Sequence, residues 1–290
     1  MPKQLLFFLK FKSCWKSIIT KPTSSTMNKT HLLSLIAGSA VLGSAHAGTS
    51  APASSGSGSA APLLSEASSM ITGSVTLGYD TDYVYRGFEV LSADGKEADN
   101  LVWGALDLNA ALTDKLSLNF NTWYASSASS NYDELDVYTR LTYDLGVVSV
   151  GPSFKWYNYP HYPGSIDNQY EIGLEFFASP VENLNLSAGA FYEFEAEQWY
   201  FQLDANYAIK VTENFSLVPG ATISYIDVDS TEFALDLSDF HHAAVYLKAP
   251  IKLASNVVLT PYIAGNFPLS DIDHVQDEIV YGGANISVSF

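Results

Sequence analysis

The stretch YGGANISVSF, residues 281–290, has the pattern of a β-strand with two unlike faces. Small or apolar residues alternate with polar ones up to a final aromatic: Ala284, Ile286, Val288 and Phe290 against Asn285, Ser287 and Ser289. A side-chain period of two is typical of a strand, because successive side chains point to opposite faces of a sheet. One face of this strand is therefore apolar and the other is polar.

The same period of two continues through residues 70–290 and predicts about twelve strands. The expected spans are 70–87, 99–112, 116–126, 133–145, 147–158, 168–179, 184–195, 198–210, 215–227, 241–253, 257–267 and 278–290. Most are longer than the usual globular strand of about 5–6 residues, and they match the ~9–11 tilted residues that cross a bilayer. Proline cannot donate a ladder hydrogen bond, so bulges or rim positions are expected at Pro152, Pro219, Pro250 and Pro261.

The connections between these spans alternate in length. Short turns are expected at 113–115, 145–146, 180–183, 211–214 and 254–256, and longer polar loops at 89–98, 127–132, 160–167, 229–240 and 270–277. Short turns on one side and longer loops on the other are typical of outer-membrane barrels. The sequence therefore predicts an all-β fold, a transmembrane antiparallel up-and-down barrel of about 12 strands over residues 69–290.

A sheet in lipid must close on itself, because every backbone polar group needs a partner there. The last strand is thus expected to pair with the first, and the outer face to contact outer-membrane lipids. Ile286, Val288 and Phe290 are predicted to form the signal that the barrel-assembly machinery recognises. Taken alone, this stretch also fits the edge strand of a soluble sandwich.

The N-terminal 47 residues are predicted to be a signal peptide region. From Met27, a basic residue, a short apolar run and an A-x-A site lead to expected cleavage after Ala47, and residues 1–26 precede the expected true start. Residues 48–68, rich in Ser, Ala and Gly, are expected to be a flexible linker. Beyond Ala47 the chain has eight basic against 31 acidic residues and no cysteine. This acidic balance argues against a nucleic-acid partner.

Charged residues within the expected strands gather on the phase opposite the apolar one. A lysine or arginine that faces lipid at mid-depth costs about 2–4 kcal/mol, so this phase is expected to face the lumen. The candidate lumen or constriction residues are Asp80, Asp82, Arg86, Asp107, Asp136, Arg140, Glu171, Glu175, Glu193, Asp204 and Lys248. Aromatic residues near strand ends, including Tyr79, Tyr83, Tyr85 and Phe88, are expected in the belts at the membrane surfaces.

The segment VTLGYDTDYVYRGF, residues 75–88, resembles the start of the TorF family of porins, which has a motif close to SDYVFRGI on its first strand. Asp82, Tyr83, Val84, Arg86 and Gly87 match this motif, whereas Thr81, Tyr85 and Phe88 depart from it conservatively. The resemblance implies an outer-membrane location and passive transport. It brings no substrate and no catalytic residue.

Asp80, Asp82 and Arg86 are expected on one face of the first strand, since their spacings are two and four residues. Arg86 could then pair with a carboxylate on a neighbouring strand. Two interpretations remain open: a charged constriction of the lumen, or a structural ion pair that fixes strand register.

The function predicted from these features is a porin-like outer-membrane channel for passive diffusion of small polar or cationic solutes. A barrel of about 12 strands leaves a narrow lumen, and acidic walls disfavour anions. No catalytic residue, metal site or cofactor is predicted.

Two alternatives from other classes stay open. The first is a lipid-modifying enzyme built on Ser238, His241 and His242, with His161 and His274 in expected loops, although no G-x-S-x-G sequence surrounds a serine. The second is a structural or adhesion barrel whose acidic loops bind cations. Those loops carry Asp229, Glu232, Asp236 and Asp239, and then Asp271, Asp273 and Asp277, but their spacing is not that of an EF-hand and solvated loops are the simpler explanation.

Overall fold

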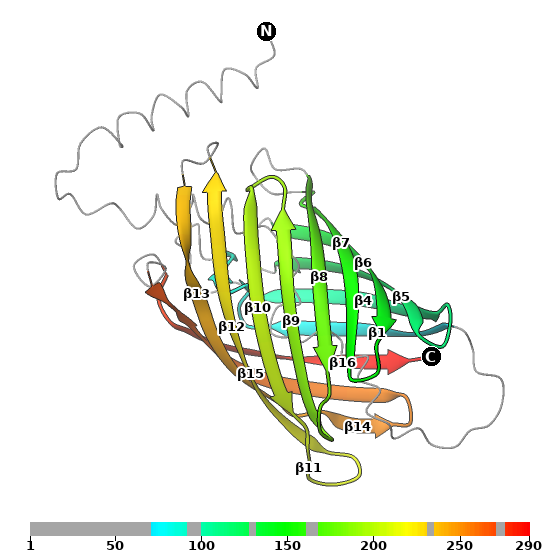
Figure 1. The fold of residues 1–290 in the computed structure, drawn as a ribbon. Helices are drawn as coiled ribbons and strands as arrows, with labels where there is room; N and C mark the ends of the chain where they lie inside the picture. The colour runs from blue at the N-terminus through cyan, green and yellow to red at the C-terminus, as the bar shows by residue number, and fades with distance from the viewer. Residues whose placement is uncertain (1–70, 92–99, 128–131, 161–167, 231–234, 271–275) are drawn as a thin grey trace, which may run out of the picture.

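Twelve long antiparallel strands form the wall of the protein in a computed structural model, which describes residues 71–91, 100–127, 132–160, 168–230, 235–270 and 276–290 (Figure 1). These strands are β1 (Ile71–Asp80), β4 (Leu101–Ala111), β5 (Leu116–Ser127), β6 (Asp133–Asp144), β7 (Val148–Asn158), β8 (Asn168–Ala178), β9 (Leu184–Glu193), β10 (Gln198–Tyr207), β12 (Ser216–Ser230), β13 (Leu235–Lys248), β15 (Val257–Pro268) and β16 (Ile279–Ser289). The described part also has four short strands, β2 (Val84–Tyr85), β3 (Phe88–Glu89), β11 (Ile209–Lys210) and β14 (Ile251–Ala254).

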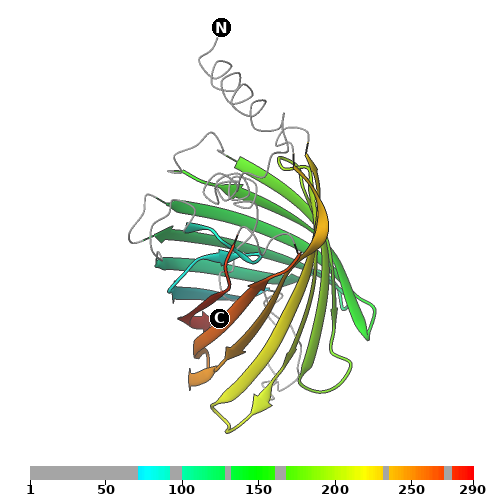
Figure 2. The same cartoon turned by 90° about the vertical axis from the view of Figure 1, so that its left-hand side faces the viewer.

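The sheet closes into a barrel, as the sequence predicts. Each long strand pairs antiparallel with the next one along the chain, and β1 pairs with β16 from Asp80↔Gly283 to Ser74↔Ser289. Beyond that register, Gly73 and Phe290 exchange two backbone hydrogen bonds of 3.0 and 2.9 Å. The quarter-turn view in Figure 2 shows the strong tilt of the strands. The all-β, twelve-stranded, antiparallel barrel is therefore confirmed.

Apolar side chains cover the outside of this barrel. In β1, Val75, Leu77 and Tyr79 are exposed, with Leu77 at 61%, whereas Asp80 is fully buried. Exposed apolar side chains recur at alternate positions of the other long strands, among them Leu203 of β10 and Val245 of β13. An outward apolar band of this kind is what a transmembrane barrel presents to lipid. Among the described residues, no helix has the length and apolarity to cross a membrane.

Proline positions differ from the expectation. Pro152, Pro219 and Pro261 lie inside β7, β12 and β15 without a change of register, whereas Pro250 separates β13 from β14. Pro261 lies opposite the break that Pro250 makes, and its carbonyl accepts a hydrogen bond from Ala249. The missing N–H of Pro261 therefore faces the break between β13 and β14, where no strand residue needs it as a hydrogen-bond donor. Of the two expectations for these positions, bulges or rim positions, the bulge is therefore not found at any of the three prolines within strands.

A real bulge lies elsewhere, between β12 and β13. The register shifts between Ile223 and Tyr225, so that His241 and His242 together oppose Ser224. Two residues opposite one is the usual form of a β-bulge. Both imidazoles are buried inside the barrel, at 0% and 5% exposure.

The first strand is shorter than predicted. β1 ends at Asp80, whereas the expected span continued to residue 87. The segment from Thr81 to Leu91 leaves the wall, and its side chains from Tyr83 to Tyr85 are buried. Tyr83, Tyr85 and Phe88 therefore do not lie in an interfacial belt, because they pack inside the barrel with the lumen-facing aromatics of other strands.

Residues 1–70 lie outside the described part of the chain, so the signal peptide region 1–47 and the linker 48–68 stay predictions.

The seam between the first and last strands makes a specific prediction at Gly283. A methyl group there would collide with the backbone carbonyl of Tyr79 and the Asp80 carboxylate. Gly283→Ala should lower the unfolding free energy by about 1–3 kcal/mol, because the seam must shift to make room. Gly104→Ala is the matched control, since its nearest neighbour is the flexible Leu77 side chain at 3.2 Å. Urea unfolding in lipid vesicles, followed by tryptophan fluorescence, measures both; equal midpoints for the two variants would contradict the prediction.

Candidate functional site

A hairpin folds into the lumen directly after β1. Val84 pairs with Glu89 and Tyr85 with Phe88, so that Arg86 and Gly87 form the two-residue loop of β2 and β3. Both loop residues have positive φ, 43° and 86°, which is the geometry of the tight hairpin turns that favour glycine. A side chain at Gly87 would also collide with the imidazole of His242. We call residues 83–90 the lumen hairpin.

The lumen hairpin spans the barrel from one wall to the opposite one. On one side, the Tyr83 hydroxyl donates a hydrogen bond of 2.7 Å to Glu134 of β6. On the other, the Phe88 ring lies 4.3 Å from the His241 ring of β13, and the Asn266 amide of β15 donates to the Gly87 carbonyl at 2.8 Å. β6 and β13 are half the ring apart in the strand order. The hairpin therefore crosses the interior and narrows it.

Arg86 fixes the tip of the lumen hairpin to β8. Its guanidinium lies 2.7 Å from a carboxylate oxygen of Glu171 and 4.2 Å from the centre of the Tyr200 ring. Burial is the largest effect on Arg86 and by itself lowers the pKa, but the Glu171 charge and hydrogen bond, together with Tyr85 and Tyr157, more than offset it, so the pKa is raised. The guanidinium is therefore permanently charged, and it is held by a buried ion pair and an aromatic ring together.

The placement of Asp82 and Arg86 on the first strand was wrong, because both follow its last residue, Asp80. Arg86 does pair with a carboxylate, but Glu171 belongs to β8, which is not adjacent to β1. Asp82 accepts a hydrogen bond from the Thr81 hydroxyl at 3.0 Å. Asp80 faces the interior and accepts from Trp103 at 2.8 Å and from Tyr262 at 2.6 Å.

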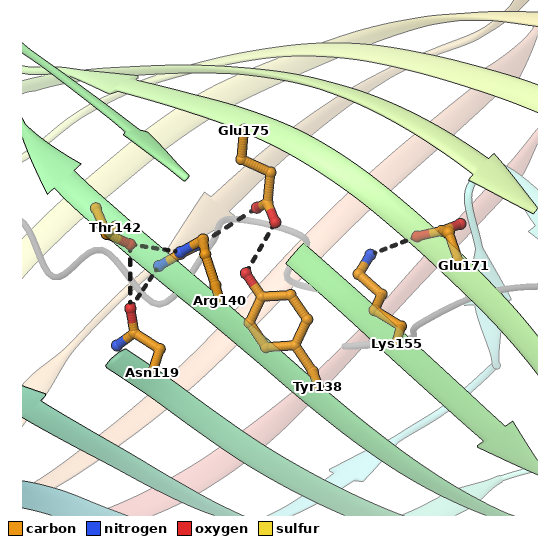
Figure 3. A network of polar contacts seen from close by, with 7 residues as sticks. All are labelled: Asn119, Tyr138, Arg140, Thr142, Lys155, Glu171 and Glu175. Atoms are coloured by element: carbon orange, nitrogen blue, oxygen red, sulfur yellow. Dashed lines mark hydrogen bonds and ion pairs between the residues drawn. The ribbon is translucent and has the colours of Figure 1, made fainter. Parts of the chain in front are cut away.

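A polar network covers the wall formed by β5 to β8 (Figure 3). Glu175 binds Arg140 at 3.2 Å and accepts from the Tyr138 hydroxyl at 2.8 Å. Lys155 lies 3.0 Å from the second oxygen of Glu171, which therefore joins Lys155 to Arg86. Paired charges of this kind can remain in a dry interior, because each has an opposite charge at contact distance.

The remaining candidates belong to separate contacts. Asp107 accepts from Asn121 at 2.6 Å. Asp204 accepts from Thr222 at 2.8 Å and from Tyr246 at 3.0 Å, and the Lys248 ammonium lies 4.7 Å from the centre of the Tyr246 ring.

Glu193 has a structural role at the end of β9. Its carboxylate accepts backbone hydrogen bonds from Glu195 at 3.0 Å and from Ala196 at 2.6 Å. This side chain therefore closes the turn between β9 and β10.

One cavity of about 640 Å³ lies between the lumen hairpin and the short-turn end of the barrel. Five of the predicted lumen residues line it: Arg86, Asp107, Asp136, Arg140 and Glu175. Asp80, Asp82, Glu171, Glu193, Asp204 and Lys248 do not line it. Lys155, which the period of two already places on the lumen phase of its strand, also lines it. Tyr138 lines it as well and shares the lumen phase of Asp136 and Arg140, so the same period could have identified it.

The residues of the enzyme alternative do not form a catalytic pair on the outer wall. The Ser238 hydroxyl lies 2.8 Å from the Tyr225 hydroxyl on the outside. His242 faces inward, with its Nδ1 2.7 Å from Ser224 and 2.9 Å from His241. His161 and His274 lie outside the described residues.

The acidic loops of the adhesion alternative fall partly outside the described residues, at Glu232, Asp271 and Asp273. Within the described ranges, no group of three His, Cys, Asp or Glu side chains is placed to hold a metal ion.

Comparisons with known proteins bear on the architecture alone. A scan against protein-family models and a sequence search of curated proteins return no match. The COG4313 outer membrane channel from Pseudomonas putida F1 is similar in structure, with a TM-score of 0.50, 14% identity, and coverage of 80% of this chain and 100% of that chain. The KdgM porin has a TM-score of 0.47 and 13% identity, with coverage of 75% of this chain and 99% of that chain. LpxR from Salmonella typhimurium has a TM-score of 0.43 and 11% identity, with coverage of 74% of this chain and 99% of that chain. At these identities the likeness shows the fold alone, and that fold is an outer-membrane type of β-barrel.

The buried ion pairs predict an order of stabilities. Glu171→Gln leaves the Arg86 and Lys155 cations close together without their shared anion, so it should lower the unfolding free energy by about 3–5 kcal/mol. Glu175→Gln is the matched control, because Arg140 still donates to Thr142 at 3.1 Å. Urea unfolding in lipid vesicles compares the two. A Glu175→Gln variant at least as unstable as Glu171→Gln would show that the Arg86–Glu171–Lys155 group does not hold the hairpin.

Proposed function

We propose that this protein is a narrow, porin-like channel of the bacterial outer membrane through which small polar or cationic solutes diffuse passively. The observation that carries the proposal is a closed barrel with an apolar outside and a polar interior that contains a cavity. An apolar outside needs lipid, and a polar interior needs water or solute. The resemblance of residues 75–88 to the TorF family supports the same function.

The charge of the interior supports a preference for cations. Eight acidic side chains are buried in the described part of the chain: Asp80, Asp82, Glu134, Asp136, Glu171, Glu175, Glu193 and Asp204. Arg140 and Lys155 are the buried basic residues there, and the Arg86 side chain, 7% exposed, is a third cation. The cavity itself is lined by equal numbers of acidic and basic residues, so the acidic excess lies in the interior around the cavity. The field of that excess supports a preference for cations.

The lumen hairpin supports a size limit on the solutes. It crosses between opposite walls and is packed against the buried rings of Trp123, Tyr132 and Tyr157. Twelve strands enclose more space than their own side chains fill, and the hairpin occupies part of that space. Solutes that pass would therefore be small.

Outer-membrane lipids and the barrel-assembly machinery are the proposed partners. Ile286, Val288 and Phe290 point outward at the end of the seam and are 38%, 40% and 67% exposed. This exposed apolar row is available to an assembly factor before lipid covers it.

Ion selectivity tests the proposed channel directly. In planar bilayers with a tenfold KCl gradient, we expect channel activity and a reversal potential of the sign that cation preference gives. Asp107→Asn should reduce that preference, because it removes a charge from the cavity wall. Asp114→Asn makes the same charge change in an expected short turn and should leave the preference unchanged. Anion preference would contradict the predicted selectivity, and absence of conductance would favour a structural barrel.

Shortening the lumen hairpin should widen the channel. The Val90 amide already donates to the Tyr83 carbonyl at 2.8 Å, so Asn-Gly can replace residues 84–89 as a tight turn. This variant should show a higher single-channel conductance, because the obstruction between β6 and β13 is removed. Tyr85→Phe keeps the hairpin and should conduct like the unaltered protein. Unchanged conductance in the shortened variant would mean that the hairpin does not limit the pathway.

A further inference from the structure

The wall that β4 and β5 contribute to the cavity carries side-chain amides and one carboxylate. Asn119 donates a hydrogen bond of 2.9 Å to Asn109, and Asn121 donates one of 2.6 Å to Asp107. All four residues line the cavity, and Asp107 and Asn109 are only partly buried. In the described part of the chain, each of these two uses a single oxygen on the protein. The second Asp107 oxygen and the Asn109 N–H groups are therefore available to a solute.

Gln202 of β10 adds donors from the opposite side of the lumen. In the strand order, β10 and β12 are half the ring away from β4 and β5. Gln202 is partly buried and lines the cavity, and its oxygen accepts a hydrogen bond of 3.2 Å from the Tyr200 hydroxyl. Its N–H groups have no partner among the described residues. The cavity thus has unused donors and an unused acceptor on facing walls.

One aromatic ring presents a face to the same cavity. Tyr246 of β13 pairs with Gly220 of β12, and a side chain at Gly220 would collide with the Tyr246 ring, so the ring lies over this glycine. The Tyr246 hydroxyl donates to Asp204 at 3.0 Å, which fixes the ring on the wall. The Lys248 ammonium is 4.7 Å from the ring centre, but Lys248 does not line the cavity. One ring face is therefore turned to the wall and the other to the cavity that Tyr246 lines.

The basic residues of the cavity are already paired. Arg86 and Lys155 both bind Glu171, and Arg140 binds Glu175 at 3.2 Å. The cavity is lined by equal numbers of acidic and basic residues. An anionic solute therefore finds no free basic partner there, and recognition depends mainly on the amide groups and the aromatic ring.

We propose that the cavity binds a neutral polyhydroxylated solute, such as a mono- or disaccharide, whose ring packs on Tyr246. Its hydroxyls bind Asp107, Asn109 and Gln202. Each sugar hydroxyl is both a donor and an acceptor, so it can pair with a carboxylate oxygen and with an amide N–H. The C–H groups on one face of a sugar ring are apolar and pack on an aromatic face.

The size of the cavity agrees with such a ligand. Its volume of about 640 Å³ lies within the ~300–1,000 Å³ that is usual for small-molecule sites. The lumen hairpin forms one end of it, through residues 84–87. The inference rests on the proposed function, because it identifies a class of small polar solute that the lumen admits.

Saturation-transfer NMR tests this site on the full chain in micelles of lauryldimethylamine oxide, a detergent without a sugar headgroup. The probes are glucose, glucuronate, glucosammonium and diglyme. The first three share a ring and differ in charge, whereas diglyme is a neutral ether without O–H donors. We expect saturable binding of glucose, with transfer to the C–H protons of one ring face. Glucuronate should bind about tenfold more weakly or not at all, glucosammonium no more tightly than glucose, and diglyme not at all.

Substitutions separate recognition of the sugar from support of the wall. Asn109→Leu should weaken glucose binding about five- to tenfold, because a hydrogen bond is lost. Tyr246→Leu should weaken it similarly and remove the transfer to the ring face, whereas Tyr246→Phe keeps the ring and should not. Asn185→Leu is the matched control, because the Asn185 amide donates to Asn206 at 3.0 Å and Asn185 does not line the cavity.

Other results overturn the inference. Equal binding of diglyme would show that hydroxyl donors are not recognised, and tighter binding of glucuronate or glucosammonium would show a site for charged solutes. An equal loss in Asn185→Leu would show a structural effect. Unchanged affinity in Asn109→Leu would place the sugar elsewhere, and Gln202→Leu provides the same test should that variant fail to fold.

The binding measurement does not require conduction, so the two proposals fail separately. Glucose binding without conductance would refute the channel but not the site. Cation-selective conductance without glucose binding would refute only the site.

Discussion

The proposed membrane location sets the constraint on which this structure depends: backbone hydrogen bonds must be completed where no water is present to pair with them. A sheet can meet it only by closing, so β1 and β16 must match in length and register, from Asp80↔Gly283 to the Gly73–Phe290 pair. Closure then divides every strand into an apolar outer face and an inner face that has to be filled. The lumen hairpin and the paired charges are two ways in which this chain fills that inner face.

The interior is organised by hydrogen-bonding needs more than by hydrophobicity. Buried acids are matched one by one, as Glu171 is by Arg86 and Lys155 and as Asp204 is by Tyr246 and Thr222. The Arg86–Glu171 pair holds the tip of the lumen hairpin on β8, whereas Asp204 joins β10 to β12 and β13.

The wall of the barrel could be predicted from the sequence because one local signal, the period of two, determines which side chains face lipid. The lumen hairpin could not be predicted in this way. The alternation of Val75, Leu77 and Tyr79 continues through Tyr83 and Tyr85, so the sequence pattern gives no sign that the strand ends. The backbone turns at Arg86 and Gly87, which both have positive φ, whereas a continuing strand would need negative φ there. The dipeptide Arg-Gly is only a weak sequence signal for such a turn. The contacts of Arg86 with Glu171 depend on distances across the lumen, which no local pattern contains.

Adjacent residues of one strand offer the most direct test of a closed barrel with an apolar outside and a wet inside. Gln202 lines the cavity, whereas Leu203 is 58% exposed on the outer face. In the full chain with Cys14 replaced by serine, the Gln202→Cys and Leu203→Cys variants would each be reconstituted in lipid vesicles and treated with a water-soluble maleimide. In a closed barrel in lipid, the first cysteine should react and the second should be protected by lipid. Reaction at both positions, or at Leu203→Cys alone, would contradict it.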